Sequence, residues 1–147
     1  MDYDNAISTL NNLIETCKDG ENGFRTAADG VKNSELKTLF TNYSQQRAKF
    51  AAELQGEVSG LGGDPEKTGS VVATLHRGWI NIKSAVTGES EAAVIAECES
   101  GEDSAKANYE EALKEDLPAQ VKSTIERQYG MVKEAHDRIR DLKRATS

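Results

Sequence analysis

The stretch DNAISTLNNLIETCKDGENGFRTAADG, residues 4–30, predicts a long helix, because its apolar residues recur with the period of an α-helix. They form a stripe along one side that is apolar except at Glu21. Such a stripe is typical of a helix that buries one face against other helices. Gly30 should end this helix, since glycine is a common C-terminal stop. The stripe consists of Tyr3, Ile7, Leu10, Ile14, Cys17, Glu21, Phe24, Ala28 and Val31.

A second helical stripe covers about residues 34–59, after a linker of a few residues in which Asn33 or Ser34 can cap the helix. Because the linker is short, we expect the two helices to form an antiparallel hairpin. The middle turn of the second helix is polar and contains Arg47. Counting outward from the turn places Glu21 level with residues 43–47, so we predict that Glu21 and Arg47 are neighbours.

The second half of the chain repeats this organisation after a long connection. Residues 60–67 read as a loop because of their glycines and proline. Val72, Leu75, Trp79, Ile82 and Val86 then fall on one face of a short amphipathic helix. A long helix over about residues 90–115 and a last helix opened by Pro118 follow. Two hairpins joined by one long crossover predict an all-α, ferritin-like four-helix bundle, with residues 1–147 forming a single domain.

The composition limits the fold classes and the kinds of function that fit this chain. Aromatic residues make up only 5% of the chain, which favours helices packed through aliphatic and alanine contacts over a β-sandwich. The net charge of −7 opposes nucleic-acid binding. No stretch approaches the ~20 apolar residues of a membrane span, and no basic, apolar leader is present, so we predict a cytoplasmic protein. Cys17 and Cys98 are expected to be buried, reduced thiols.

Several motifs resemble those of a known family. LHRGWINIKSAVTG (residues 75–88), AECESGED (96–103), Tyr109 and AHDRIRDL (135–142) are similar to a bacterial family of ferritin-like four-helix-bundle proteins of unknown function, and so is LNNLIETCKDGENGFRTAA in the first helix. The resemblance covers essentially the whole chain, and the HRGWxNxK and ExGED motifs are fairly specific. It implies a ferritin-like fold and a link to stress responses, without an activity that can be carried over.

A complete di-iron site does not fit the sequence. Such a site needs a Glu from each of two helices and a Glu-x-x-His from each of the other two, because residues i and i+3 share a helix face. The two histidines are His76 and His136, and the residues three positions before them are Ala73 and Lys133. No Glu-x-x-His therefore exists in the chain.

Two interpretations of the polar residues in the middle of the predicted bundle remain open. In the first, Glu21 pairs with Arg47, with support from Gln46, Gln128 and Glu99, because a buried carboxylate needs a charged partner. In the second, a partial site binds a single divalent metal such as iron. Its ligands would be Glu21, Glu99, Glu102 and His136.

These interpretations lead to two functional hypotheses. The first is a non-catalytic, stress-associated or interaction protein with a degenerate polar core, without a cofactor and able to form a homo-oligomer through exposed helix faces or the crossover. The alternative is a metal-binding protein that uses the partial carboxylate and histidine site. We predict no enzymatic activity, no contact with nucleic acid or membranes, and a partner protein whose identity the sequence does not specify.

Overall fold

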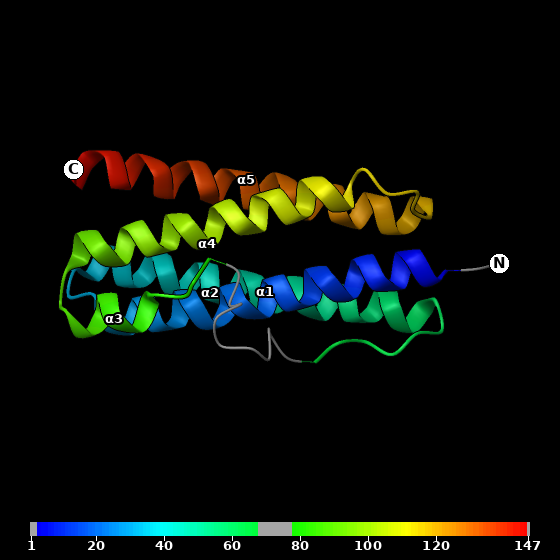
Figure 1. Ribbon diagram of the computed structural model, residues 1–147, viewed down its shortest axis with the longest axis horizontal. Helices are drawn as coiled ribbons and strands as arrows, with labels where there is room; N and C mark the ends of the chain where they lie inside the picture. Colours follow the sequence, from blue (N-terminus) through cyan, green and yellow to red (C-terminus); the bar gives the residue numbers. More distant parts are fainter. Residues whose placement is uncertain (1–2, 68–77, 147) are drawn as a thin grey trace.

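The computed structural model describes residues 3–67 and 78–146, and these residues form five helices that pack together (Figure 1). Four long helices lie along the long axis of the molecule, and a short one packs at the end where the first hairpin turns (Figure 1). The predicted all-α class is confirmed. The helices are α1 (Asp4–Gly30), α2 (Ser34–Gly60), α3 (Ile82–Thr87), α4 (Glu91–Ala112) and α5 (Ala119–Thr146).

Local sequence signals explain where α2 and α4 begin. The Asn33 side-chain oxygen accepts hydrogen bonds from the backbone N–H groups of Glu35 at 2.9 Å and Leu36 at 3.1 Å. The Ser90 hydroxyl accepts one from the N–H of Ala93 at 3.2 Å. These caps satisfy N–H groups that have no partner inside the helix. Helix α1 ends at Gly30, as the sequence predicts.

The interior contains two apolar clusters. The crossover core lies at the α3 end of the molecule, and the distal core fills the other half, where α4 turns into α5. The crossover core comprises Phe24, Ala27, Ala28, Val31, Leu36, Phe40, Trp79, Ile82, Val94, Ile95, Cys98 and Ile139. The distal core comprises Leu10, Leu13, Ile14, Cys17, Phe50, Ala51, Leu54, Val58, Ala105, Tyr109, Ala112, Val121, Ile125 and Val132.

In the described part of the crossover, the helix begins later than the sequence predicts. Only Ile82–Thr87 is helical in this described part. The predicted residues Val72, Leu75 and His76 lie outside the described residues. Trp79 is 4% exposed and packs the crossover onto the long helices.

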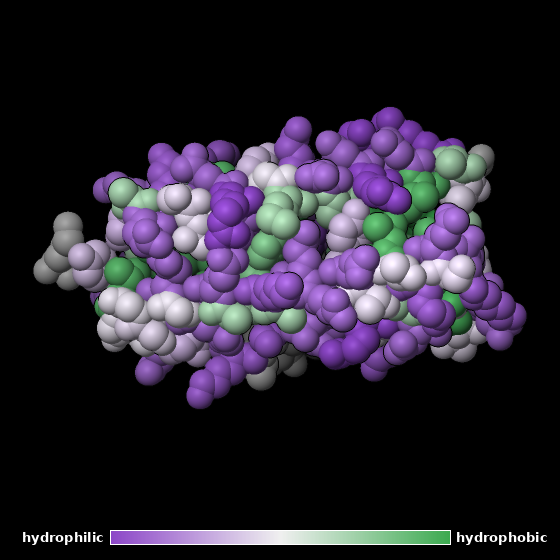
Figure 2. Space-filling view, turned by 180° about the vertical axis from the view of Figure 1, so that it is seen from behind, coloured by the Kyte–Doolittle hydropathy of each residue, from purple (hydrophilic) through white to green (hydrophobic). Residues whose placement is uncertain are grey.

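The face of the molecule seen in Figure 2 is largely hydrophilic. The face seen in Figure 2 shows apolar residues in patches along its middle, separated by hydrophilic ones. Among the described large apolar side chains, only Ile80 and Met131 are strongly exposed, at 58% and 40%. Within residues 3–67 and 78–146, we find no helix with the length and hydropathy needed to traverse a bilayer.

Candidate functional site: a buried polar layer

A buried ion pair lies in the middle of the molecule. Arg47 of α2 donates to Glu102 of α4 through both ends of its guanidinium, from Nη1 to Oε1 at 2.6 Å and from Nη2 to Oε2 at 2.7 Å. The two side chains are 1% and 0% exposed. Paired hydrogen bonds of this kind are the strongest geometry available to arginine and a carboxylate. The pair therefore connects α2 and α4 through the interior.

The surroundings of Arg47 are shaped to receive it. A Cβ added at Gly20 would lie only 3.3 Å from Arg47 Cγ, so the glycine leaves space for the arginine stem. The guanidinium carbon lies 5.5 Å from the centre of the Phe24 ring, a cation–π distance. Burial acts to lower the pKa of Arg47, but the charge and hydrogen bonds of Glu102 outweigh it and raise the pKa. Arg47 therefore stays protonated inside the protein.

A chain of hydrogen bonds runs beside the ion pair. Tyr109 donates its hydroxyl hydrogen to Gln128 Oε1 at 2.7 Å, so the 3.1 Å contact between Cys17 Sγ and the Tyr109 oxygen has the thiol as donor. The Gln128 amide then donates to the Phe50 carbonyl at 3.3 Å and to Glu53 at 3.1 Å. The buried side chains of Cys17, Tyr109 and Gln128 are thus all hydrogen-bonded to other protein groups. We call Arg47, Glu102, Cys17, Tyr109 and Gln128 the polar layer.

The two thiols are suited to packing rather than to chemistry. Burial raises the pKa of Cys17 to about 11. Burial also raises the pKa of Cys98 well above its usual range. The thiolate is the reactive form of cysteine, so burial disfavours the nucleophilic form of both residues. Both are free and buried, which confirms the prediction for these residues.

The predicted pairing of Glu21 with Arg47 is wrong. The register is right, because the Ser44 hydroxyl donates to the backbone carbonyl of Glu21 at 2.8 Å. The Glu21 side chain, however, is 21% exposed and faces Lys18 at 3.5 Å and Arg25 at 3.9 Å. A seven-residue stripe drifts about 20° per heptad around a straight helix. By the middle of α1 this drift turns Glu21 to the edge and places the buried Gly20 opposite Arg47.

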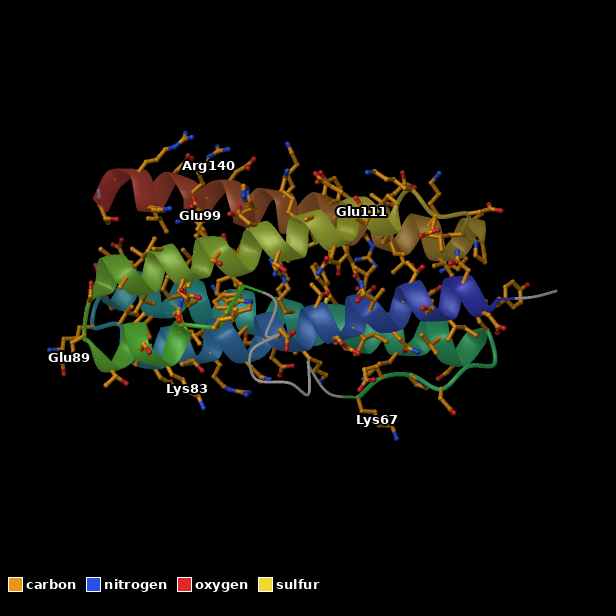
Figure 3. All side chains as sticks on the ribbon, in the orientation of Figure 1. Lys67, Lys83, Glu89, Glu99, Glu111 and Arg140 are labelled. Carbon is orange, nitrogen blue, oxygen red and sulfur yellow. The ribbon has the colours of Figure 1, made fainter. Side chains whose placement is uncertain are left out.

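The other three predicted metal ligands contact separate partners. Glu99 accepts from Lys143 at 2.8 Å and lies between α4 and α5 (Figure 3). Glu102 has both oxygens on Arg47. His136 Nε2 lies 2.6 Å from Asp103.

This placement affects how a metal could bind. In the part of the chain that the structure describes, no three His, Cys, Asp or Glu side chains are grouped as a metal site. A metal at Glu102 would also have to displace the guanidinium that occupies both carboxylate oxygens. The four predicted ligands, Glu21, Glu99, Glu102 and His136, therefore do not come together at one site in this arrangement.

Sequence reasoning missed the role of Glu102 as the partner of Arg47. The signal was present, because Glu102 lies four residues after Cys98 and three before Ala105, on the buried seam of α4. Of the predicted ligands Glu99 and His136, Glu99 lies opposite Lys143, and Asp103 takes the place next to His136.

A model of the family described as a domain of unknown function, DUF2383, matches residues 5–115 of the chain. The matched range includes α1 to α4, and with them Arg47, Glu102, Cys17 and Tyr109 of the polar layer. No curated protein matches the chain.

Proposed function

The chain belongs to the DUF2383 family, and we propose that it is a non-catalytic ferritin-like four-helix bundle that acts through association with other macromolecules, copies of itself included. Four long helices, two short-linked hairpins and a crossover between them support this fold assignment (Figure 1). The resemblance of its motifs to ferritin-like proteins supports it independently. A role in stress responses rests on that resemblance alone.

The observation that carries the proposal is the closed ion pair of Arg47 and Glu102. Bundles of this class place metals in their interior, on carboxylates from facing helices. Here the interior carboxylate is neutralised by a guanidinium and hydrogen-bonded at both oxygens. In this bidentate pair each Glu102 oxygen accepts a hydrogen bond from the guanidinium, and the carboxylate has no uncompensated charge that would attract a cation.

The rest of the polar layer supports a structural role. Cys17, Tyr109 and Gln128 are all buried and hydrogen-bonded to protein groups. A buried network of this kind adds little net stability but favours one arrangement of the helices over others. We infer that the layer keeps the four long helices in register, while contacts with partners are made on the outside.

Metal loading tests the non-catalytic part of the proposal. The purified protein is incubated with iron(II), manganese(II) or zinc(II), separated from free metal and analysed for each element. We expect substoichiometric metal. Stoichiometric metal that is lost in Glu102→Gln, but retained when the exposed Glu91 is changed to Gln, would overturn the proposal. The double variant Arg47→Met/Glu102→Leu makes the same comparison without leaving a single buried charge.

Self-association is tested by light scattering during size-exclusion chromatography over a wide concentration range. Ile80 and Met131 are the strongly exposed large apolar residues among those described, and Ile80 lies on the crossover. We expect a larger species at high concentration that Ile80→Asp or Met131→Asp weakens. A strict monomer at every concentration would remove self-association from the proposal.

A further inference from the structure

Two glycines on different helices face the same aromatic side chain. A Cβ added at Gly23 of α1 would lie 2.2 Å from Trp79 Cδ2, and one at Gly101 of α4 would lie 2.1 Å from Trp79 Cε2. Real Cβ atoms do not approach other atoms so closely. The indole therefore occupies space that exists only because both helices lack a side chain at this point.

The crossover approaches the long helices at glycines elsewhere too. Gly78 has φ +90°, and a Cβ there would lie 2.4 Å from the Ser100 carbonyl oxygen. A Cβ added at Gly30 would lie 2.4 Å from Val86. Other glycines leave more room, and a Cβ at Gly130 would meet nothing within 4 Å. Among the described glycines, the approaches closer than 2.5 Å are all between the crossover and the long helices.

The space between Gly23 and Gly101 has the chemistry of a site for an aromatic ring. Phe24 contacts the indole edge to face, with ring centres 4.9 Å apart. The rim opens into a pocket of about 220 Å³ that is bordered in part by Thr26 and Lys83. A flat ring can therefore pack on an aromatic face inside and reach solvent at the rim.

We propose that Gly23, Gly101 and Phe24 form an aromatic socket, a binding site for a planar bicyclic ring, which this chain fills with its own Trp79. The Trp79 side chain then holds the crossover in place by occupying this site, and without Trp79 the socket can bind a free ring of the same shape. Apolar cavities on the order of 150 Å³ in protein interiors stay dry and bind small aromatic molecules, which is the behaviour we expect here.

The test removes the plug and supplies the ring. Trp79→Ala is titrated with indole while the melting temperature is followed by circular dichroism. We expect a saturable rise of a few degrees in the variant and no change in the natural protein, whose socket is occupied. Absence of a saturable rise in folded Trp79→Ala would overturn the proposal.

Two double variants show where the ring binds. Trp79→Ala/Gly101→Ala places a methyl group in the socket and should lose the response to indole. Trp79→Ala/Gly130→Ala adds the same methyl where it meets nothing and should keep the response. An equal response in both would contradict the assignment. If Trp79→Ala is unfolded alone, recovery of its helical signal on adding indole supports the socket, and failure to recover overturns it.

Discussion

The two halves of the interior are filled in different ways. The distal core is built from aliphatic side chains such as Leu10, Leu13 and Leu54, which interlock between helices. The crossover core depends as much on missing side chains, because Gly23 and Gly101 create the space that Trp79 fills. It also gathers aromatic rings, with Phe24 in contact with both Phe40 and Trp79.

The Arg47–Glu102 pair of the polar layer lies between these two cores, since each residue is flanked along its helix by members of both. Arg47 faces the crossover core through its contact with the Phe24 ring, whereas Tyr109 belongs to the distal core. The distal core is therefore specified by its large side chains, and the crossover core also by the side chains that its glycines lack. We expect the two cores to respond separately to mutation, and a change in the polar layer to affect both.

The largest effect is expected for Glu102→Gln. This change leaves the Arg47 charge buried without its counter-charge, which costs about 3–5 kcal/mol in comparable cases. Urea denaturation should show this loss of free energy of unfolding, and the native-state fluorescence of Trp79 should change. The double variant Arg47→Met/Glu102→Leu should recover most of the loss, because replacing both partners by apolar residues is often neutral. A loss below about 1 kcal/mol in the single variant would mean that the pair is exposed to water.

Leu54→Ala tests the distal core alone. Leu54 is fully buried, and its truncation should cost about 2–5 kcal/mol through lost burial and the cavity left behind. The single tryptophan of the chain, Trp79, reports on the crossover core. We expect its native-state fluorescence to be unchanged in Leu54→Ala. A shifted emission maximum would show that the two cores do not respond separately to mutation.

The Cys17 thiol should make stability depend on alkaline pH. Its pKa is raised from 9.0 to about 11 by burial, so between these values the folded state keeps a proton that the unfolded state releases. The stabilisation is therefore complete below pH 9 and lost as the pH rises towards 11, on the order of 2–3 kcal/mol. The free energy of unfolding, measured by denaturation at several pH values from 8 to 11, should fall less steeply with pH for Cys17→Ala than for the natural protein. Equal slopes would contradict the buried position of this thiol.

The sequence predicts the distal core better than it predicts the polar layer and the crossover core. The helices and the buried positions of the distal core follow from periodicity, which large apolar residues report directly. Pairing across the interior was harder, because a few tens of degrees of helix rotation decide which side chain points inward. That rotation moved Glu21 to the edge and left Glu102 as the partner of Arg47.

The glycines were the least predictable part. In a helix a glycine indicates weakness, since it costs about 1 kcal/mol relative to alanine. Gly20 and Gly23 lie inside α1 and nevertheless pack against the Arg47 stem and the Trp79 indole ring. Nothing in a single sequence shows which large side chain a glycine accommodates, because that contact joins distant residues and depends on the finished packing.

The smallest effect, and the sharpest test of the comparison, is expected for Gly101→Ala. Alanine is the better helix former, but its methyl group would overlap the indole, and overpacking of a core typically costs about 1–3 kcal/mol. Gly130→Ala, where an added Cβ meets nothing, should instead gain up to about 1 kcal/mol from helix propensity alone. Thermal denaturation should give opposite signs for the two variants, with a shifted Trp79 emission only in Gly101→Ala. If Gly101→Ala were as stabilising as Gly130→Ala, the indole would not occupy the space between the helices, and the crossover core would not depend on missing side chains.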